Sequence, residues 1–135
     1  MSFSSQISLF VKQGKNSPKK ARDRTLIKLF GAIIEDSPVD TGRLRGNWQT
    51  NIGFANLSTK QRNAPAGQAP LKRAREEINS AEFKDEIYFT NNLPYAEAIE
   101  NGHGGRTPGV MVAKNVLRFG QLMTREATRQ RRKKK

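Results

Sequence analysis

Two short motifs in this sequence contain residues that could do chemistry. The triplet Asp40-Thr41-Gly42 is the one in which an aspartic protease carries its reactive carboxylate, and there two carboxylates share one proton. Here Arg43 and Arg45 follow the triplet, and their positive charges favour ionisation of both carboxylates in such a pair. Two ionised carboxylates cannot share a proton, so we do not expect a protease.

The second motif is the glycine-rich stretch His103-Gly104-Gly105, whose backbone could hold an oxyanion. The chain has no Gly-x-Ser-x-Gly elbow for such a loop to serve, and no Gly-Lys-Ser/Thr sequence that would make it a phosphate loop. The chain contains no cysteine, and His103 is its only histidine. Thiol nucleophiles, zinc sites and Ser-His-Asp triads therefore lack their residues, and we expect neither catalysis nor a bound metal or cofactor.

The charge of the chain is strongly positive and unevenly distributed. The 135 residues carry a formal net charge of +13, which predicts a polyanionic partner. Residues 12–28 hold seven basic side chains and one acidic, whereas residues 76–100 hold seven acidic and one basic. Such polarity suits head-to-tail contact between identical copies, and it is equally typical of two solvated faces.

Two groups of cations are candidates for contact with DNA or another polyanion. No aromatic side chains are interleaved with them, so we expect non-specific contact with phosphates and no readout of sequence. The first group lies on a predicted helix and the second in a basic tail: Lys19, Lys20, Arg22 and Arg24, and then Arg129, Arg131, Arg132, Lys133, Lys134 and Lys135.

Apolar periodicity predicts the helices. Amphipathic helices are expected at residues 3–11, 18–36, 71–80 and 112–127, the second with Ser17 as its N-cap and an end near Asp36. A shorter helix is expected after Pro94, ending at Gly102, a residue that tolerates a left-handed backbone.

Alternating apolar residues predict two strands, one at residues 48–54 and one that begins at residue 83 and ends at Thr90-Asn91-Asn92. Residues 55–70 contain almost no large apolar side chain and are expected to form a long flexible loop or arm. The fold class is therefore α+β: residues 1–128 form one domain with a small antiparallel sheet packed by two or three helices, and residues 129–135 form a disordered basic tail. We expect no signal peptide and no membrane span, and hence a soluble protein made in the cytoplasm.

Two stretches, taken together, resemble a known family. Ser37-Pro38-Val39-Asp40-Thr41-Gly42-Arg43-Leu44-Arg45 is followed about fifty residues later by Asn91-Asn92-Leu93-Pro94-Tyr95-Ala96 and Ile99-Glu100-Asn101-Gly102. This combination is similar to the tail-component family of tailed bacteriophages, the neck or tail-completion proteins found between the head connector and the tail tube. The similarity covers roughly residues 21–119. The motif positions are Pro38, Asp40, Thr41, Gly42, Arg43, Leu44, Tyr95, Ala96, Glu100 and Gly102.

The resemblance implies a structural virion protein, made in the host cytoplasm, that assembles with itself as a six-fold ring in the phage neck. Its neighbours would be the connector and tail proteins, and DNA would pass through the ring. It also implies that Asp40 and Gly42 shape a turn and that Tyr95 and Ile99 anchor the short helix, and we expect Glu100 to pair with an arginine such as Arg43. The alternative is a free basic nucleic-acid-binding protein, for which the charge is the argument, although no helix-turn-helix or zinc-finger signature is present.

Overall fold

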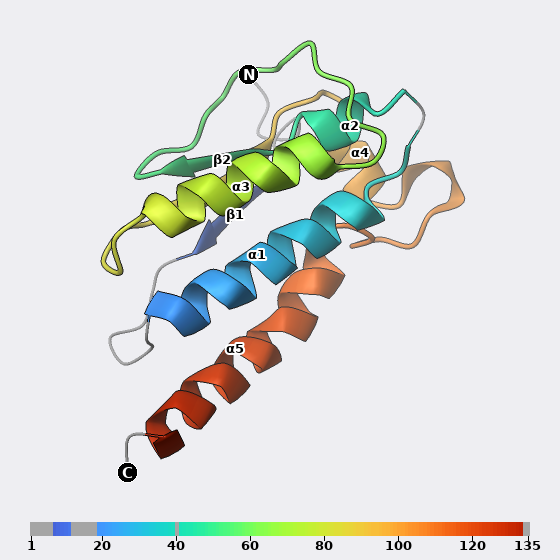
Figure 1. Ribbon diagram of the computed structural model, residues 1–135. Coiled ribbons are helices and arrows are strands. Elements are labelled where there is room, and N and C mark those ends of the chain that lie inside the picture. The colour runs from blue at the N-terminus through green and yellow to red at the C-terminus, as the bar shows by residue number, and fades with distance from the viewer. Residues whose placement is uncertain (1–6, 12–18, 40, 134–135) are drawn as a thin grey trace.

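The computed structural model describes residues 7–11, 19–39 and 41–133, without the side chains of residues 7–11, 21, 122–123 and 126–133 (Figure 1). Within these ranges the fold is α+β, with an antiparallel sheet covered by helices. No helix in the described part is both long and apolar enough to cross a membrane. The strands are β1 (Ile7–Val11), β2 (Gln49–Ile52) and β3 (Ile87–Asn91), and the helices are α1 (Lys19–Asp36), α2 (Arg43–Gly46), α3 (Gln68–Ser80), α4 (Ala96–Glu100) and α5 (Ala113–Lys133).

Strand β3 lies at the centre of the sheet, in the order β1-β3-β2. Both neighbours run antiparallel to it, with Thr50 of β2 and Leu9 of β1 each opposite Phe89. Helices α1 and α3 lie side by side over one face of the sheet, and α5 packs along α1 on the side away from α3 (Figure 1).

Three aromatic rings hold the helix layer to the sheet. Phe89 stacks on Phe30 of α1 with ring centroids 4.0 Å apart, and on Trp48 with centroids 4.6 Å apart. All three side chains are fully buried. Because such stacking adds about 1 kcal/mol per pair to the gain from burial, this sandwich is a central part of the core.

The predicted helix at residues 18–36 is confirmed as α1, although Ser17 and Pro18 lie outside the described residues. Its apolar stripe of Leu26, Leu29, Phe30 and Ile33 is buried as the periodicity indicates. The helix ends where expected because the residue before Pro38 is pushed out of the helical region. That residue, Ser37, instead donates its hydroxyl to the carbonyl of Ile33 at 2.8 Å.

The predicted helix at residues 3–11 is wrong for the part that the structure describes, since Ile7–Val11 form β1. An isolated helix of this length is marginal in water, whereas the free edge of β3 supplies backbone hydrogen bonds along the whole segment. Isoleucine, phenylalanine and valine also fit a pleated surface well. Phe3 lies outside the described residues.

The expectation that the basic tail is disordered is also wrong for the residues that the structure describes. Helix α5 continues to Lys133, so residues 129–133 are not a separate disordered segment, and Lys134 and Lys135 lie outside the described residues. Arginine, glutamine and lysine are good helix formers, and cations are favoured at the C-terminal end of a helix dipole. Helicity therefore persists after the apolar stripe ends.

The long loop has neither helix nor strand between Gly53 and Gly67, as predicted, although α3 already begins at Gln68. It does not stand away from the domain. The side chain of Asn47 donates to the carbonyl of Lys60 at 3.0 Å and accepts from its N–H at 2.7 Å. Gln49 donates to the carbonyl of Ser58 at 2.7 Å. Buried amide side chains thus hold the loop against β2.

Both predicted strands are shorter in the structure. Trp48 and Phe54 lie outside β2, and Phe83 lies outside β3. Trp48 is buried in the aromatic sandwich, whereas Phe54 is 57% exposed beyond the end of the strand. The stretch before Trp48 forms the short helix α2, which alternation could not reveal.

Candidate functional site

The two halves of the family motif, far apart in sequence, lie next to each other in the fold. The first half forms the turn before α2 and α2 itself, and the second follows β3 and includes α4. Asn91 links them, because its fully buried side-chain amide donates to the carbonyl of Leu44 at 2.8 Å.

Between these segments lies an open hollow of about 520 Å³, which we name the motif pocket. Val39 and Tyr95 are 46% and 40% exposed at this pocket, so apolar surface faces solvent there. Apart from Arg106, every lining residue belongs to the two motif stretches. The lining residues are Pro38, Val39, Thr41, Arg43, Leu44, Tyr95, Ile99 and Arg106.

The described lining of the motif pocket carries two cations and no carboxylate; Asp40, beside it in sequence, lies outside the described residues. Arg106 donates to the carbonyl of His103 at 3.0 Å. The Nε of Arg43 is buried and has no hydrogen-bond partner among the described residues. The two arginines make the described lining positively charged, so the pocket is suited to an acidic or carbonyl group from outside this chain.

Gly42 shapes the first half of the motif. Its φ is 87°, and a Cβ at this position would lie 2.5 Å from the backbone nitrogen of Pro65. Its carbonyl accepts the N–H groups of Gly46 and Ala64, both at 2.9 Å. The glycine is therefore required both by the turn and by the loop that packs on it.

Glu100 has a different partner from the one expected. Its carboxylate accepts the backbone N–H groups of Met111, Val112 and Ala113 at 2.9–3.0 Å, at the start of α5. These donors have no partner inside a helix, and a negative charge is favourable at that end of the helix dipole. The pairing with Arg43 is wrong, and Glu100 is instead the cap of α5.

Of the two expected anchors of the short helix, Ile99 packs partly against the core, beside fully buried Ala96. Tyr95 is 40% exposed and lines the motif pocket, so it is not an anchor in the core. Gly102 ends the helix with a φ of 93°, as expected.

The predicted polyanion contacts on α1 divide into two kinds. Arg22 is only 2% exposed, and its guanidinium binds Asp23 and the carbonyls of Glu82 and Phe83. It holds α1 to the segment before β3 and cannot reach a polyanion, so that assignment is wrong. Lys19 pairs with the same Asp23, while Lys20 is exposed and Arg24 half-buried. For the tail cations, the structure describes only the backbone, to Lys133.

Sequence reasoning missed the role of Arg45. Its guanidinium donates to the carbonyls of Ser37 at 2.9 Å and of Glu35 and Pro65 at 2.7 Å. It thus joins the end of α1 to the loop before α3. A signal existed, since an arginine shortly after a helix is well placed to bind the last free carbonyls.

Among the described side chains, no group of three or more histidine, aspartate and glutamate residues could hold a metal ion. Comparisons with protein-family models, with curated proteins and with solved structures find no match to this chain.

Proposed function

We propose that this chain is a structural virion protein of a tailed bacteriophage, forming a ring in the neck that joins or completes the tail at the head connector. DNA would pass through the ring. The observation that supports this proposal is the convergence of the two motif halves on one exposed surface, the motif pocket. At this pocket Val39 and Tyr95 leave apolar and aromatic surface facing solvent, as a contact between subunits requires.

The chemistry of the motif pocket suits a contact between subunits. Tyrosine and arginine are the residue types that carry most binding energy in protein interfaces. Here Tyr95, Arg43 and Arg106 lie around one hollow. An acidic or carbonyl group of a neighbouring copy would bind these arginines and cover the apolar rim.

A ring also needs a second, different surface on each copy, because contacts in a ring are head-to-tail. The side chains of Glu76 and Glu82, on α3 and just after it, are exposed and acidic. Phe54 and Leu57 in the long loop are 57% and 65% exposed. These residues offer acidic and apolar groups to the motif pocket of the next copy. We propose that six copies joined in this way close the ring.

The first test is quantitative mass spectrometry of purified particles of the phage that encodes this chain. A small fixed copy number per particle, a multiple of six, is the expected result. Absence of the chain from intact particles would overturn the assignment.

The second test asks whether the motif pocket is the assembly surface. Nuclease-treated protein is examined by light scattering, alone or with its connector, as wild type and as Val39→Asp and Tyr95→Asp variants. Both substitutions should abolish ring-sized species, because each replaces apolar contact surface by a carboxylate that can pair with Arg43 or Arg106 and repels the acidic groups of the next copy. The matched control is Leu117→Asp, since Leu117 is 74% exposed on α5 away from the pocket. A monomer that binds duplex DNA tightly at about 0.2 M salt would favour the alternative, a free nucleic-acid-binding protein.

A further inference from the structure

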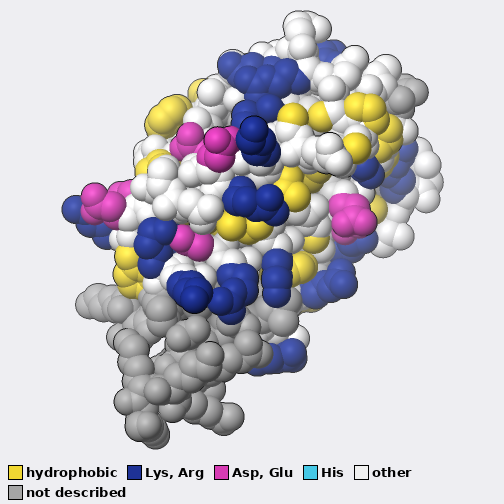
Figure 2. Space-filling view, viewed as in Figure 1, with side chains coloured by type: hydrophobic (Ala, Val, Ile, Leu, Met, Phe, Trp, Pro, Cys, Tyr) yellow, Lys and Arg dark blue, Asp and Glu magenta, His cyan; other side chains and the backbone are white. Residues whose placement is uncertain are grey.

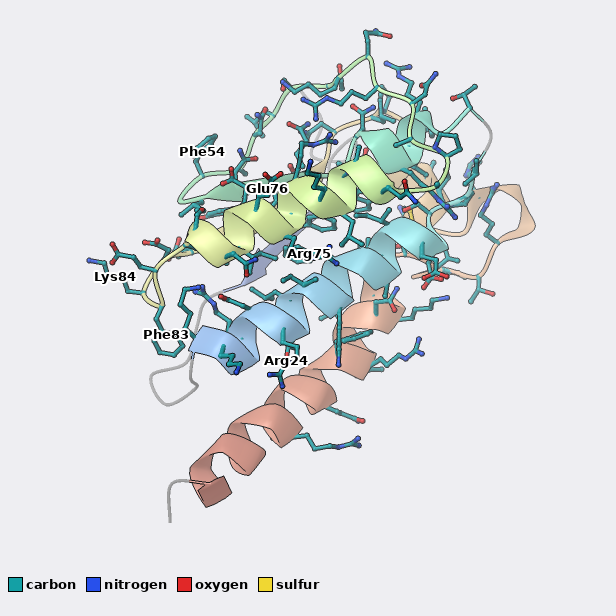
Figure 3. The ribbon with its side chains drawn as sticks, viewed as in Figure 1. Arg24, Phe54, Arg75, Glu76, Phe83 and Lys84 are labelled. Carbon is teal, nitrogen blue, oxygen red and sulfur yellow. The ribbon has the colours of Figure 1, made fainter. Side chains whose placement is uncertain are left out.

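A second hollow, which we name the α1–α3 groove, lies between these two helices and encloses about 720 Å³. Figure 2 shows dark-blue lysine and arginine side chains gathered on this face, over the region where Figure 1 draws α1. Figure 3 shows Arg75 projecting from α3 toward α1, and Arg24 on α1. The lining residues are Lys19, Lys20, Asp23, Arg24, Ile27, Lys28, Arg75 and Asn79.

Among its described lining residues, this groove has more cations than acids. Five of the lining residues are cationic and only Asp23 is acidic. The carboxylate of Asp23 is already bound by Lys19 and by buried Arg22. Lys20, Lys28 and Arg75 are exposed and form no ion pair within the described residues. These three side chains therefore present positive charge that no described residue pairs.

The cations of α1 form a regular row. Lys20, Arg24 and Lys28 follow one another at intervals of four residues, which places them on one side of the helix about 6 Å apart along its axis. Like charges at this spacing weaken a helix slightly. Arg75 projects from α3 toward α1, so cations from both helices border a hollow that is open to solvent and to a chain of anions.

We propose that the α1–α3 groove binds the phosphate backbone of duplex DNA and does not read its base sequence. Lysines and arginines in a row provide charges that phosphates can contact in succession. A protein partner would need an aromatic or large apolar anchor, and a lipid surface would need side chains to insert. Ile27 is the one large apolar residue of the lining and is half-buried. With no aromatic residue to stack on bases, duplex rather than single-stranded DNA fits the groove.

This site does not depend on the virion role. The motif pocket and the α1–α3 groove share no lining residue, so failure of one proposal leaves the other standing.

The test compares two triple variants of the full chain by DNA affinity measured across a series of salt concentrations. The groove variant is Lys20→Gln, Lys28→Gln and Arg75→Gln. The control variant removes the same charge from exposed positions outside the groove, by Lys72→Gln, Lys84→Gln and Arg118→Gln. Unchanged melting temperatures would show that both variants fold. The probe is a short duplex of arbitrary sequence.

For the groove variant, the slope of log affinity against log salt should fall in magnitude by roughly 2 to 3, about one unit per lost phosphate contact. Affinity at about 0.1 M salt should fall tenfold or more, while the control variant changes the slope by less than about 1. Equal effects of the two variants would overturn the site, because net charge alone would then explain binding. Equal or tighter binding of polyglutamate or of anionic vesicles at the same salt would overturn the assignment to DNA.

Discussion

The side-chain amide of Asn91 donates a hydrogen bond to the backbone carbonyl of Leu44 at 2.8 Å, across a separation of 47 residues. Asn91 is the last residue of β3, and Leu44 lies in α2. Both side chains are buried, so water cannot replace the bond. This contact fixes the two walls of the motif pocket relative to each other.

Replacing Asn91 by alanine should therefore lower the free energy of unfolding by about 2 kcal/mol, since the Leu44 carbonyl loses its buried donor. Urea denaturation measures the change. Asn63→Ala is the control, because Asn63 is exposed in the loop, and a change within about 0.5 kcal/mol is expected there. Equal losses in the two variants would show that the Asn91 bond is not important for stability.

A comparison of Gly42 with Gly53 can separate two costs of adding a side chain, the strain of a left-handed backbone and the steric clash with neighbouring atoms. Gly42 and Gly53 have nearly the same φ, 87° and 83°, but a Cβ at Gly53 would meet nothing within 4 Å. Alanine at either position should cost about 1–2 kcal/mol for the left-handed backbone. Gly42→Ala should cost a further 1–3 kcal/mol or so, because the loop at Pro65 must move. Thermal unfolding of the two variants tests this, and indistinguishable melting temperatures would contradict the packing of the loop on the turn.

Glu100 should contribute to stability through α5. Glu100→Gln removes the charge that accepts three backbone N–H groups, and we expect a loss of about 1–2 kcal/mol. Glu76→Gln, on the exposed face of α3, is the matched control and should have little effect. A double-mutant cycle of Glu100 with Arg43 should give a coupling energy near zero. A coupling of 1 kcal/mol or more, on the order expected for a real pair, would restore that pairing.

Arg22 and Lys20 lie two residues apart on α1, and their substitution should affect different properties of the protein, stability and DNA binding respectively. Arg22→Gln leaves Asp23 and the carbonyls before β3 without their buried cation, so about 3 kcal/mol of stability should be lost. Lys20→Gln should leave stability within about 0.5 kcal/mol and weaken DNA binding instead. Chemical denaturation and the salt series together measure both effects. Loss of stability in Lys20→Gln, with none in Arg22→Gln, would reverse the two assignments.

Local pattern determined much of this fold. The apolar stripe of α1, its end before Pro38 and the left-handed Gly102 after α4 all follow from the sequence, because periodicity, proline and glycine act on the few residues around them. The strands β2 and β3 were located to within a few residues for the same reason. The resemblance of two stretches to a phage family also came from the sequence, with no contact between them known.

Only the tertiary structure decided which residues meet. Ile7–Val11 is a strand because the edge of β3 offers it hydrogen bonds, and nothing in the segment itself indicates that edge. Glu100 caps α5 by accepting the N–H of Met111, and buried Arg22 binds the carbonyl of Glu82. Arg75 of α3 lines a groove together with residues of α1. In each case the partners are separated in the sequence. Charge and residue type can be read along the chain, but the partner of a buried charge depends on packing of the whole domain. The sequence by itself therefore determined most of the elements and the chemistry of their side chains, whereas the packing decided the fate of β1 and which cations remain available to bind.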